Sequence, residues 1–419
     1  MSHFHKEISL LQAIALLLTT LLGTGAFVVP ALSATAAGDQ VLWAWLIMLA
    51  VMLPVGMTFG LLGAIHPHAG GTAYLLGKAF GPRWQNATGW LYLALVPVGL
   101  PAAMAICVSY LGQLLGLGHQ YDGWLALGCL AIMLLINLRG VKTASQIQLL
   151  IAISVAGCLA LLIQQSELQL NTLVPPTPEL SALPEISHAM AIIFWCFMGI
   201  EAMTHMGAEL KNPRRDFPLT IVLSLLITAG FYYLTVGLVL QYGSFGNEQT
   251  DSRSLALIAE QVLGPAGDKL ISLMGFLASF ASMSLYLMSF SRLLWSMADG
   301  GELPAPLARI NSRGVPAVAL LSIGVVAALS LLMKYVALLP LDALISYADG
   351  IFVMIYLLGV ASGLRLLPSH YRPLALLATI LCGLILLAVG QYMSYALVIM
   401  LLSIGWDHYR NRQRTAIDA

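Results

Sequence analysis

Twelve stretches of mostly apolar residues follow one another along the chain, and each is long enough to cross a membrane as a helix. A hydrocarbon core of about 30 Å takes roughly 20 helical residues, because each residue advances the helix by about 1.5 Å. Helices are the expected spanning element, since they satisfy their backbone polar groups internally. The predicted spans are 9–37, 41–63, 89–115, 122–138, 147–164, 187–208, 218–242, 268–297, 315–334, 341–364, 372–389 and 391–408.

Composition agrees with this pattern, because 59% of the 419 residues are hydrophobic and only 9% are charged. A water-soluble domain could not cover so much apolar surface. The connectors between the spans are short, so we expect one membrane domain over 1–419 and no separate soluble domain. The predicted fold class is therefore an all-α integral membrane protein.

The basic residues are distributed unevenly over the two sides that these spans define. With a cytoplasmic N-terminus, 16 of the 19 Lys and Arg residues lie on the inner side and 3 on the outer side. The positive-inside rule then predicts that both termini are cytoplasmic. The inner residues are Lys6, Lys78, Arg83, Arg139, Lys142, Lys211, Arg214, Arg215, Arg292, Arg309, Arg313, Arg365, Arg372, Arg410, Arg412 and Arg414, and the outer ones are Arg253, Lys269 and Lys334.

The first span also imitates a secretory signal, with Lys6 before an apolar run and an Ala-Thr-Ala triplet at 34–36. Its apolar stretch is longer than a typical signal and is interrupted by Gly23, Gly25 and Pro30. These interruptions favour a retained, broken helix over a cleaved leader.

The glycines of the first span mark the first candidate binding site. Gly23 and Gly25 flank Thr24, and two glycines so placed can leave helical geometry. Backbone N–H groups freed there, together with the Thr24 hydroxyl, would receive a carboxylate at the start of the resuming half-helix. The alternative interpretation is a close helix crossing that needs small residues.

A second candidate break lies in the sixth span, at 194–201 (FWCFMGIE). Breaks at matching places in two five-helix halves are what an inverted-repeat transporter needs for a site at the membrane midplane. We therefore predict repeats over 9–164 and 187–364, followed by two additional helices over 372–408.

Two acidic residues, Glu201 and Asp349, fall at membrane depth. A charged carboxylate there costs roughly 2.5 to 3.5 kcal/mol, so each should face protein or water or be protonated. Either carboxyl would then carry a coupling proton, or would serve only structurally by bonding to backbone at a helix break. Ser279, Ser282 and Ser284 would offer oxygen ligands to a sodium ion, the less favoured coupling ion.

The motifs resemble those of the amino acid/polyamine/organocation transporters, over nearly the full length of the chain. The first is 23–30 (GTGAFVVP), which is similar to the broken first helix of that family. The second, 197–201 (FMGIE) with 209–218 (ELKNPRRDFP), looks like the sixth helix and the loop after it. Within the family the chain looks most like bacterial inner-membrane exporters of methionine and branched-chain amino acids.

The resemblance implies a LeuT-like fold with discontinuous helices 1 and 6, and it implies the roles of individual residues. Thr24 and Gly25 would receive the substrate carboxylate, and Gly23 and Gly199 at the breaks would belong to the same binding site. Carbonyls of Leu21, Trp195 and Met198 would accept hydrogen bonds from its ammonium group, while Trp195 and Phe197 would gate the site. A lysine that replaces sodium in span five of some proton-coupled relatives is missing from 147–162, which leaves the coupling ion open.

The broken helices and the scarcity of charge within the membrane predict a secondary transporter of neutral amino acids that works by proton-coupled alternating access, and the resemblance implies that it exports methionine, leucine, isoleucine and valine. The alternatives are an amine or polyamine carrier of the same family, and an amino acid sensor or channel. The sequence has no Walker A, HExxH or GxSxG motif, so we expect no enzymatic activity, no cofactor and no metal site. We expect a multi-pass protein of a bacterial-type inner membrane, in contact with lipid and not with nucleic acid; its oligomeric state stays open.

Overall fold

The computed structural model describes residues 6–337, 341–389 and 393–417, and over these residues the fold is helical, with an isolated parallel bridge between Ile8 and Leu210. The α-helices are α1 Leu10–Leu21, α2 Val29–Ala37, α3 Val41–Ile65, α4 Gly71–Phe80, α5 Pro82–Leu93, α6 Gly99–Leu115, α7 Asp122–Leu138, α8 Val141–Gln165, α9 Leu183–Phe194, α10 Ile200–Thr204, α11 Pro213–Tyr242, α12 Glu248–Leu263, α13 Pro265–Asp299, α14 Ala317–Val336, α15 Leu341–Leu366, α16 Arg372–Val389 and α17 Met393–Ile417. Short 3₁₀ helices are η1 Thr24–Phe27, η2 Gly38–Gln40, η3 His119–Tyr121, η4 Leu170–Leu173, η5 Leu180–Ala182, η6 Trp195–Phe197, η7 Gly207–Glu209, η8 Ala305–Ala308 and η9 Ser369–Tyr371.

Nine helical stretches within the described ranges are long and apolar enough to cross a membrane. They are Val29–Ile65, His119–Leu138, Val141–Gln165, Leu180–Thr204, Pro213–Tyr242, Pro265–Asp299, Ala317–Val336, Tyr347–Leu366 and Ser369–Leu386. Three shorter apolar helices accompany them, namely Leu10–Leu21, Gly99–Leu115 and Met393–Asp407. The prediction of an all-helical protein that crosses the membrane several times is confirmed.

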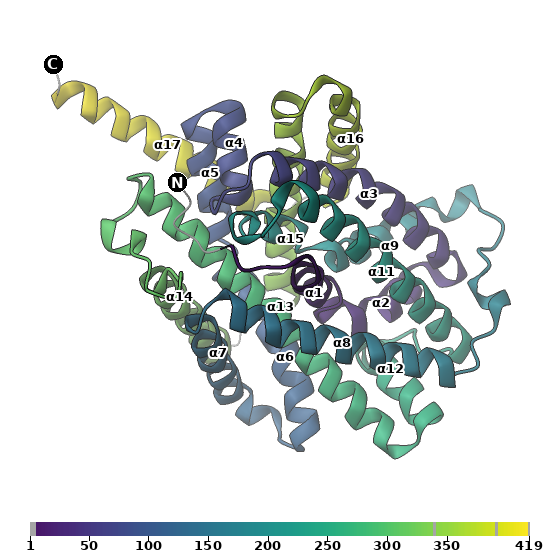
Figure 1. Ribbon diagram of the computed structural model, residues 1–419. Coiled ribbons are helices and arrows are strands. Elements are labelled where there is room, and N and C mark those ends of the chain that lie inside the picture. Colours follow the sequence, from purple (N-terminus) through teal and green to yellow (C-terminus); the bar gives the residue numbers. More distant parts are fainter. Residues whose placement is uncertain (1–5, 338–340, 390–392, 418–419) are drawn as a thin grey trace.

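The short helix α1 lies in the middle of the bundle, where α8, α11 and α13 surround it (Figure 1). Its Leu16, Leu17 and Leu21 side chains are almost completely buried, because neighbouring helices cover them on several sides. The apolar faces of α7 and α14 are by contrast partly exposed, as expected for helices that contact lipid. A protein core thus encloses the first predicted break.

The predicted span 89–115 is interrupted, which corrects the expectation of one continuous helix. α5 ends at Leu93, turns follow over 94–98, and α6 begins at Gly99. Pro97 lies in this segment and Pro101 in the first turn of α6, and proline removes a backbone donor and disfavours helix geometry in the residue before it. The hydroxyl of Tyr395 donates to the freed carbonyl of Ala94 at 3.3 Å.

Two predicted connectors contain helices that the sequence analysis did not anticipate. α4 lies within 66–83, and α12 lies between the seventh and eighth predicted spans. Thr35 of α2 donates to both carboxylate oxygens of Asp251 in α12 at 2.9 Å, so this polar helix is fastened to the half-helix that follows the first break.

Candidate functional site

The first predicted break is present in the structure. α1 ends at Leu21, Gly23 takes a non-helical conformation, and η1 carries the chain over 24–27 to α2. A Cβ at Gly23 would lie 2.8 Å from the Cβ of Ser282 in α13, and a Cβ at Gly25 would lie 2.8 Å from the sulfur of Cys196. A glycine at position 23 therefore allows the first break to lie close to α13, and a glycine at position 25 allows it to lie close to the second break.

The second predicted break is also present. α9 ends at Phe194, η6 follows, Met198 is extended, and α10 begins at Ile200. Gly199 has φ = 125°, a conformation that residues with a side chain rarely adopt, and a Cβ there would collide with Thr20 of α1. The two interrupted helices therefore pack directly against each other at their breaks.

Tyrosine hydroxyl groups satisfy carbonyl oxygens that the breaks release from helical hydrogen bonds. Tyr232 of α11 donates to the Leu21 carbonyl at 2.6 Å, and Tyr356 of α15 donates to the Phe197 carbonyl at 2.7 Å. Both tyrosines are almost completely buried, where an unpaired polar group would be costly. The sequence analysis missed them, because an aromatic residue in an apolar helix is more often a packing residue.

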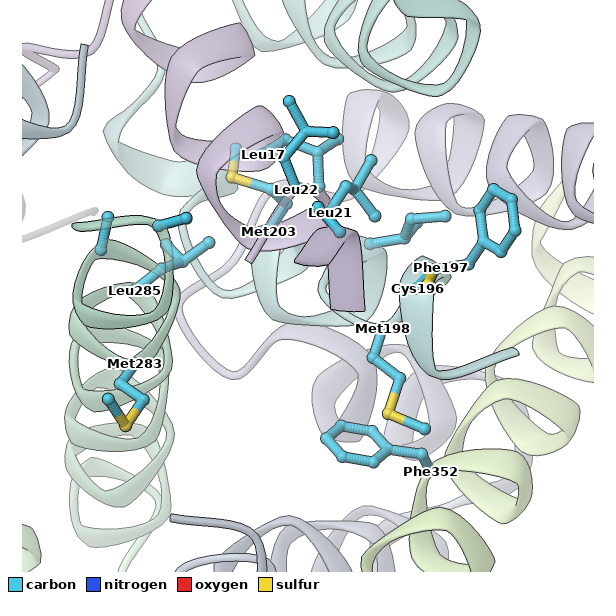
Figure 2. Packing of buried hydrophobic residues seen from close by; sticks show 14 of the residues in the cluster. Leu17, Leu21, Leu22, Cys196, Phe197, Met198, Met203, Met283, Leu285 and Phe352 are labelled. Atoms are coloured by element: carbon cyan, nitrogen blue, oxygen red, sulfur yellow. The ribbon is translucent and has the colours of Figure 1, made fainter. Parts of the chain in front are cut away.

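A pocket lies between the two breaks, the start of α6, α13 and α15. The side chains of Met198 and Phe352 lie close to each other at this site (Figure 2), and Met283 of α13 also lines the pocket. Among the described residues that line the pocket, none carries a charge. They are Thr20, Leu21, Gly25, Leu95, Gly99, Leu100, Ala103, Trp195, Met198, Ser282, Met283, Tyr286, Phe290 and Phe352.

The structure brings four of the predicted binding residues to this pocket, namely Leu21, Gly25, Trp195 and Met198. Gly23 and Gly199 lie behind it and permit the packing of the breaks. The side chain of Thr24 lies outside the described residues, so its predicted contact with a carboxylate stays a prediction.

The predicted gating residue Phe197 does not line the pocket in this conformation. Its ring is fully buried and lies 6.5 Å, between ring centroids, from that of Trp45 in α3. Its predicted partner Trp195 is half-buried and does line the pocket. Of the two residues, Trp195 is thus the one placed to contact a bound molecule.

Glu201 is fully buried in the first turn of α10, where hydrogen-bond donors hold its carboxylate. The Gly199 N–H donates to Oε2 at 2.8 Å, and the Tyr286 hydroxyl donates to Oε1 at 3.0 Å. The bond to Gly199 is the one expected of a structural carboxyl at a helix break. The bond to Tyr286, which lines the pocket, links the same carboxyl to the site.

Asp349 lies on α15, one turn before the pocket residue Phe352. Its Oδ1 atom is buried and has no hydrogen-bond partner within the described ranges. The neighbouring Ala348 lies against Gly99 at the start of α6. Its Oδ1 atom is therefore buried near the interruption between α5 and α6, and within the described residues it has no backbone contact of the kind that holds Glu201.

The three serines proposed as sodium ligands do not form one cluster of free oxygens. Ser284 accepts a hydrogen bond from Asn137 at 3.0 Å, Ser282 lines the pocket, and the Ser279 hydroxyl is buried without a hydrogen-bond partner in the described part of the chain. No group of three or more His, Cys, Asp or Glu side chains suited to a metal ion occurs among the described residues.

Arg292 was counted above among the inner loop cations, but it lies within α13 with 2% of its surface exposed. It forms an ion pair with Glu209 of η7, which is equally buried. The backbone of the same segment pairs with Ile8, whose N–H donates to the Glu209 carbonyl at 3.0 Å. This contact joins the N-terminal segment, η7 and α13.

A helical membrane protein with a pocket between interrupted helices is organised as a transporter. The sequence pattern of the amino acid permease family matches residues 8–404. The chain belongs to this family, so it is an amino acid transporter and not an enzyme.

Several relatives support this assignment. The chain is 38% identical over 401 residues to the L-methionine/branched-chain amino acid exporter YjeH of Escherichia coli (strain K12), covering 96% of each chain. It is 27% identical to the uncharacterized amino acid permease YecA of Bacillus subtilis (strain 168), covering 86% of this chain and 85% of the relative. It is 25% identical to the branched-chain amino acid permease BcaP of Lactococcus lactis, covering 78% and 75%.

Proposed function

We propose that this protein exports methionine, leucine, isoleucine and valine across a bacterial inner membrane, in exchange for protons. One observation carries the choice of substrate: the pocket between the helix breaks has an uncharged and mostly apolar lining. The exporter that is 38% identical supports both the substrates and the outward direction. A neutral amino acid would place its charged backbone groups at the breaks and its side chain against the apolar wall.

The proposed binding mode uses the breaks for the two charged groups of the substrate. Backbone N–H groups near Gly25, at the start of the second part of the first span, would bind the carboxylate. The carbonyls of Trp195 and Met198 would bind the ammonium group. The Leu21 carbonyl already accepts a hydrogen bond from Tyr232, and its second lone pair would accept one from the ammonium group.

The proposed topology has twelve spans, with two five-span repeats of inverted orientation over 9–164 and 187–364 and two further spans over 372–408. The support is positional, because the first span of each half is the one that breaks. Both termini would lie in the cytoplasm. Alternating access would then expose the pocket to each side of the membrane in turn, with Trp195 as its lid.

Glu201 and Asp349 are the proposed proton carriers, and sodium is the less favoured coupling ion. Glu201 bonds to the pocket residue Tyr286, so movement of Tyr286 on substrate binding would change the surroundings of the carboxyl. Asp349 lies one turn from Phe352, and its Oδ1 atom is buried and lacks a hydrogen-bond partner in the described part of the chain.

Counterflow tests the proposed function. Proteoliposomes loaded with unlabelled methionine should accumulate labelled methionine or leucine, and an imposed pH gradient should change the rate. Trp195→Ala should abolish accumulation, whereas Trp124→Ala, on the exposed face of α7, should leave it intact. Absence of counterflow for every neutral amino acid, with folded protein confirmed, would overturn the proposal and favour an amine carrier or a sensor.

A further inference from the structure

The pocket has two chemically different ends. Leu21, Gly25, Trp195 and Met198 bring interrupted backbone, with its free polar groups, to one end. The lining from α6, α13 and α15 is apolar at Gly99, Ala103, Met283 and Phe352, which we call the apolar end, and it also carries the hydroxyl groups of Ser282 and Tyr286. The free backbone groups of the breaks suit the two charges of a zwitterionic substrate, so its side chain would extend toward the apolar end.

Gly99 stands at the apolar end, and neither backbone conformation nor packing requires a glycine there. Its φ is not positive, so a residue with a side chain can adopt its conformation. An added Cβ would meet the Ala348 Cβ at 3.7 Å and a Leu95 methyl group at 4.0 Å, which are ordinary contacts. In contrast, a Cβ at Gly23, Gly25 or Gly199 would collide with a neighbour.

Gly99 is also the first residue of α6, and glycine favours the helical conformation less than every other residue except proline. An alanine would fit the fold as well or better, and it would take space from the pocket. The missing side chain is therefore explained by the pocket volume and not by the fold.

We propose that Gly99 determines substrate specificity, because the space left by its missing side chain admits long apolar amino acid side chains such as those of methionine and leucine. This inference rests on the proposed function. A side chain at position 99 would shorten the apolar end of the pocket and leave the breaks unchanged. The variant would therefore prefer amino acids with short side chains, such as alanine, more than the wild type does.

The test compares substrate preference in Gly99→Ala and Gly99→Val with the wild type. The assay is counterflow of labelled alanine or valine, inhibited by unlabelled methionine, leucine, valine or alanine. One methylene group in an apolar pocket changes selectivity by about 10-fold or more. Gly99→Ala should therefore raise the half-inhibitory concentration of methionine relative to that of alanine by about 10-fold, and Gly99→Val by a larger factor in the same direction.

Gly157→Val is the matched control, because Gly157 lies inside α8 and a Cβ there would meet no atom within 4 Å. Its preference for methionine over alanine should equal that of the wild type. If Gly99→Val does not fold, Gly99→Ala alone decides, since its Cβ makes only ordinary contacts. An unchanged methionine-to-alanine ratio in an active Gly99 variant would overturn this inference, whereas a wild type without any amino acid counterflow would overturn the proposed function.

Discussion

At the scale of single residues, the candidate site combines backbone groups of the two helix breaks with side chains from helices far along the chain. Leu21, Gly25, Trp195 and Met198 belong to breaks that glycine marks, and the structure brings all four to one pocket. Tyr286 and Phe352 come from α13 and α15, far along the chain. Their place depends on how the helices pack, which no local pattern encodes.

The two membrane carboxyls should respond differently to neutralisation. Glu201→Gln keeps an oxygen acceptor for the Gly199 N–H or for Tyr286, whereas Asp349→Asn changes a group whose Oδ1 has no hydrogen-bond partner in the described residues. An amide side chain does not take up or release a proton near neutral pH, so it cannot replace a carboxyl group as a proton carrier. The amide variant of a carboxyl that carries the coupling proton should keep counterflow when the pH is equal on both sides of the membrane, and it should lose the stimulation of transport by a pH gradient. An unchanged response to the gradient in both variants would show that neither carboxyl carries the proton.

At the scale of helices, the two breaks were predictable because glycine and the ionisable Glu201 interrupt apolar runs. The interruption between α5 and α6 was not predicted, although Pro97 and Pro101 signal it. The apolar run across 89–115 outweighed the two prolines, and proline is common in membrane helices. The short helix α4 was read as a connector, because its glycines and Lys78 break the apolar pattern.

Gly199 should tolerate no side chain. Gly199→Ala would force alanine into φ = 125°, which costs about 1–3 kcal/mol, and would push its methyl group into Thr20. Counterflow should fall below detection, and the midpoint of thermal unfolding in detergent should drop. The control is Gly230→Ala in α11, where a Cβ meets no atom within 4 Å. Equal activity and stability of the two variants would show that the break does not depend on this conformation.

The effects of Glu209 and Arg292, which form a buried ion pair, on thermal stability should be coupled. Removal of one partner leaves a buried charge and costs about 3–5 kcal/mol, whereas removal of both leaves none. Glu209→Gln and Arg292→Met should each lower the thermal midpoint strongly, and the double variant should be more stable than the sum of the single effects predicts. Additive losses in this double-mutant cycle would contradict a direct coupling between η7 and α13.

At the scale of the whole molecule, the sequence predicted the helical membrane class because long apolar runs leave few alternatives. The orientation was argued from loop charges, and one of those charges, Arg292, is buried in α13 instead. Its removal from the count leaves 15 inner cations against 3 outer ones, from the 19 in the chain. The predicted orientation therefore does not depend on Arg292.

Cysteine labelling in intact cells tests that orientation. The five native cysteines are buried, so the background should be low. His119→Cys and Arg215→Cys replace side chains that are 92% and 73% exposed, in segments assigned to opposite sides. A membrane-impermeant maleimide should label position 119 in intact cells and position 215 only after the membrane is opened, and the reverse pattern would place the termini outside.

The most direct test of the account is the location of a bound substrate. A crystal structure with L-selenomethionine, in which the protein keeps ordinary methionine, would reveal the substrate selenium by its anomalous signal. The account predicts a single strong peak at the apolar end of the pocket, among Gly99, Met283 and Phe352, with the amino acid backbone at the two helix breaks. A peak outside this pocket, with the pocket empty, would contradict the assignment of the site.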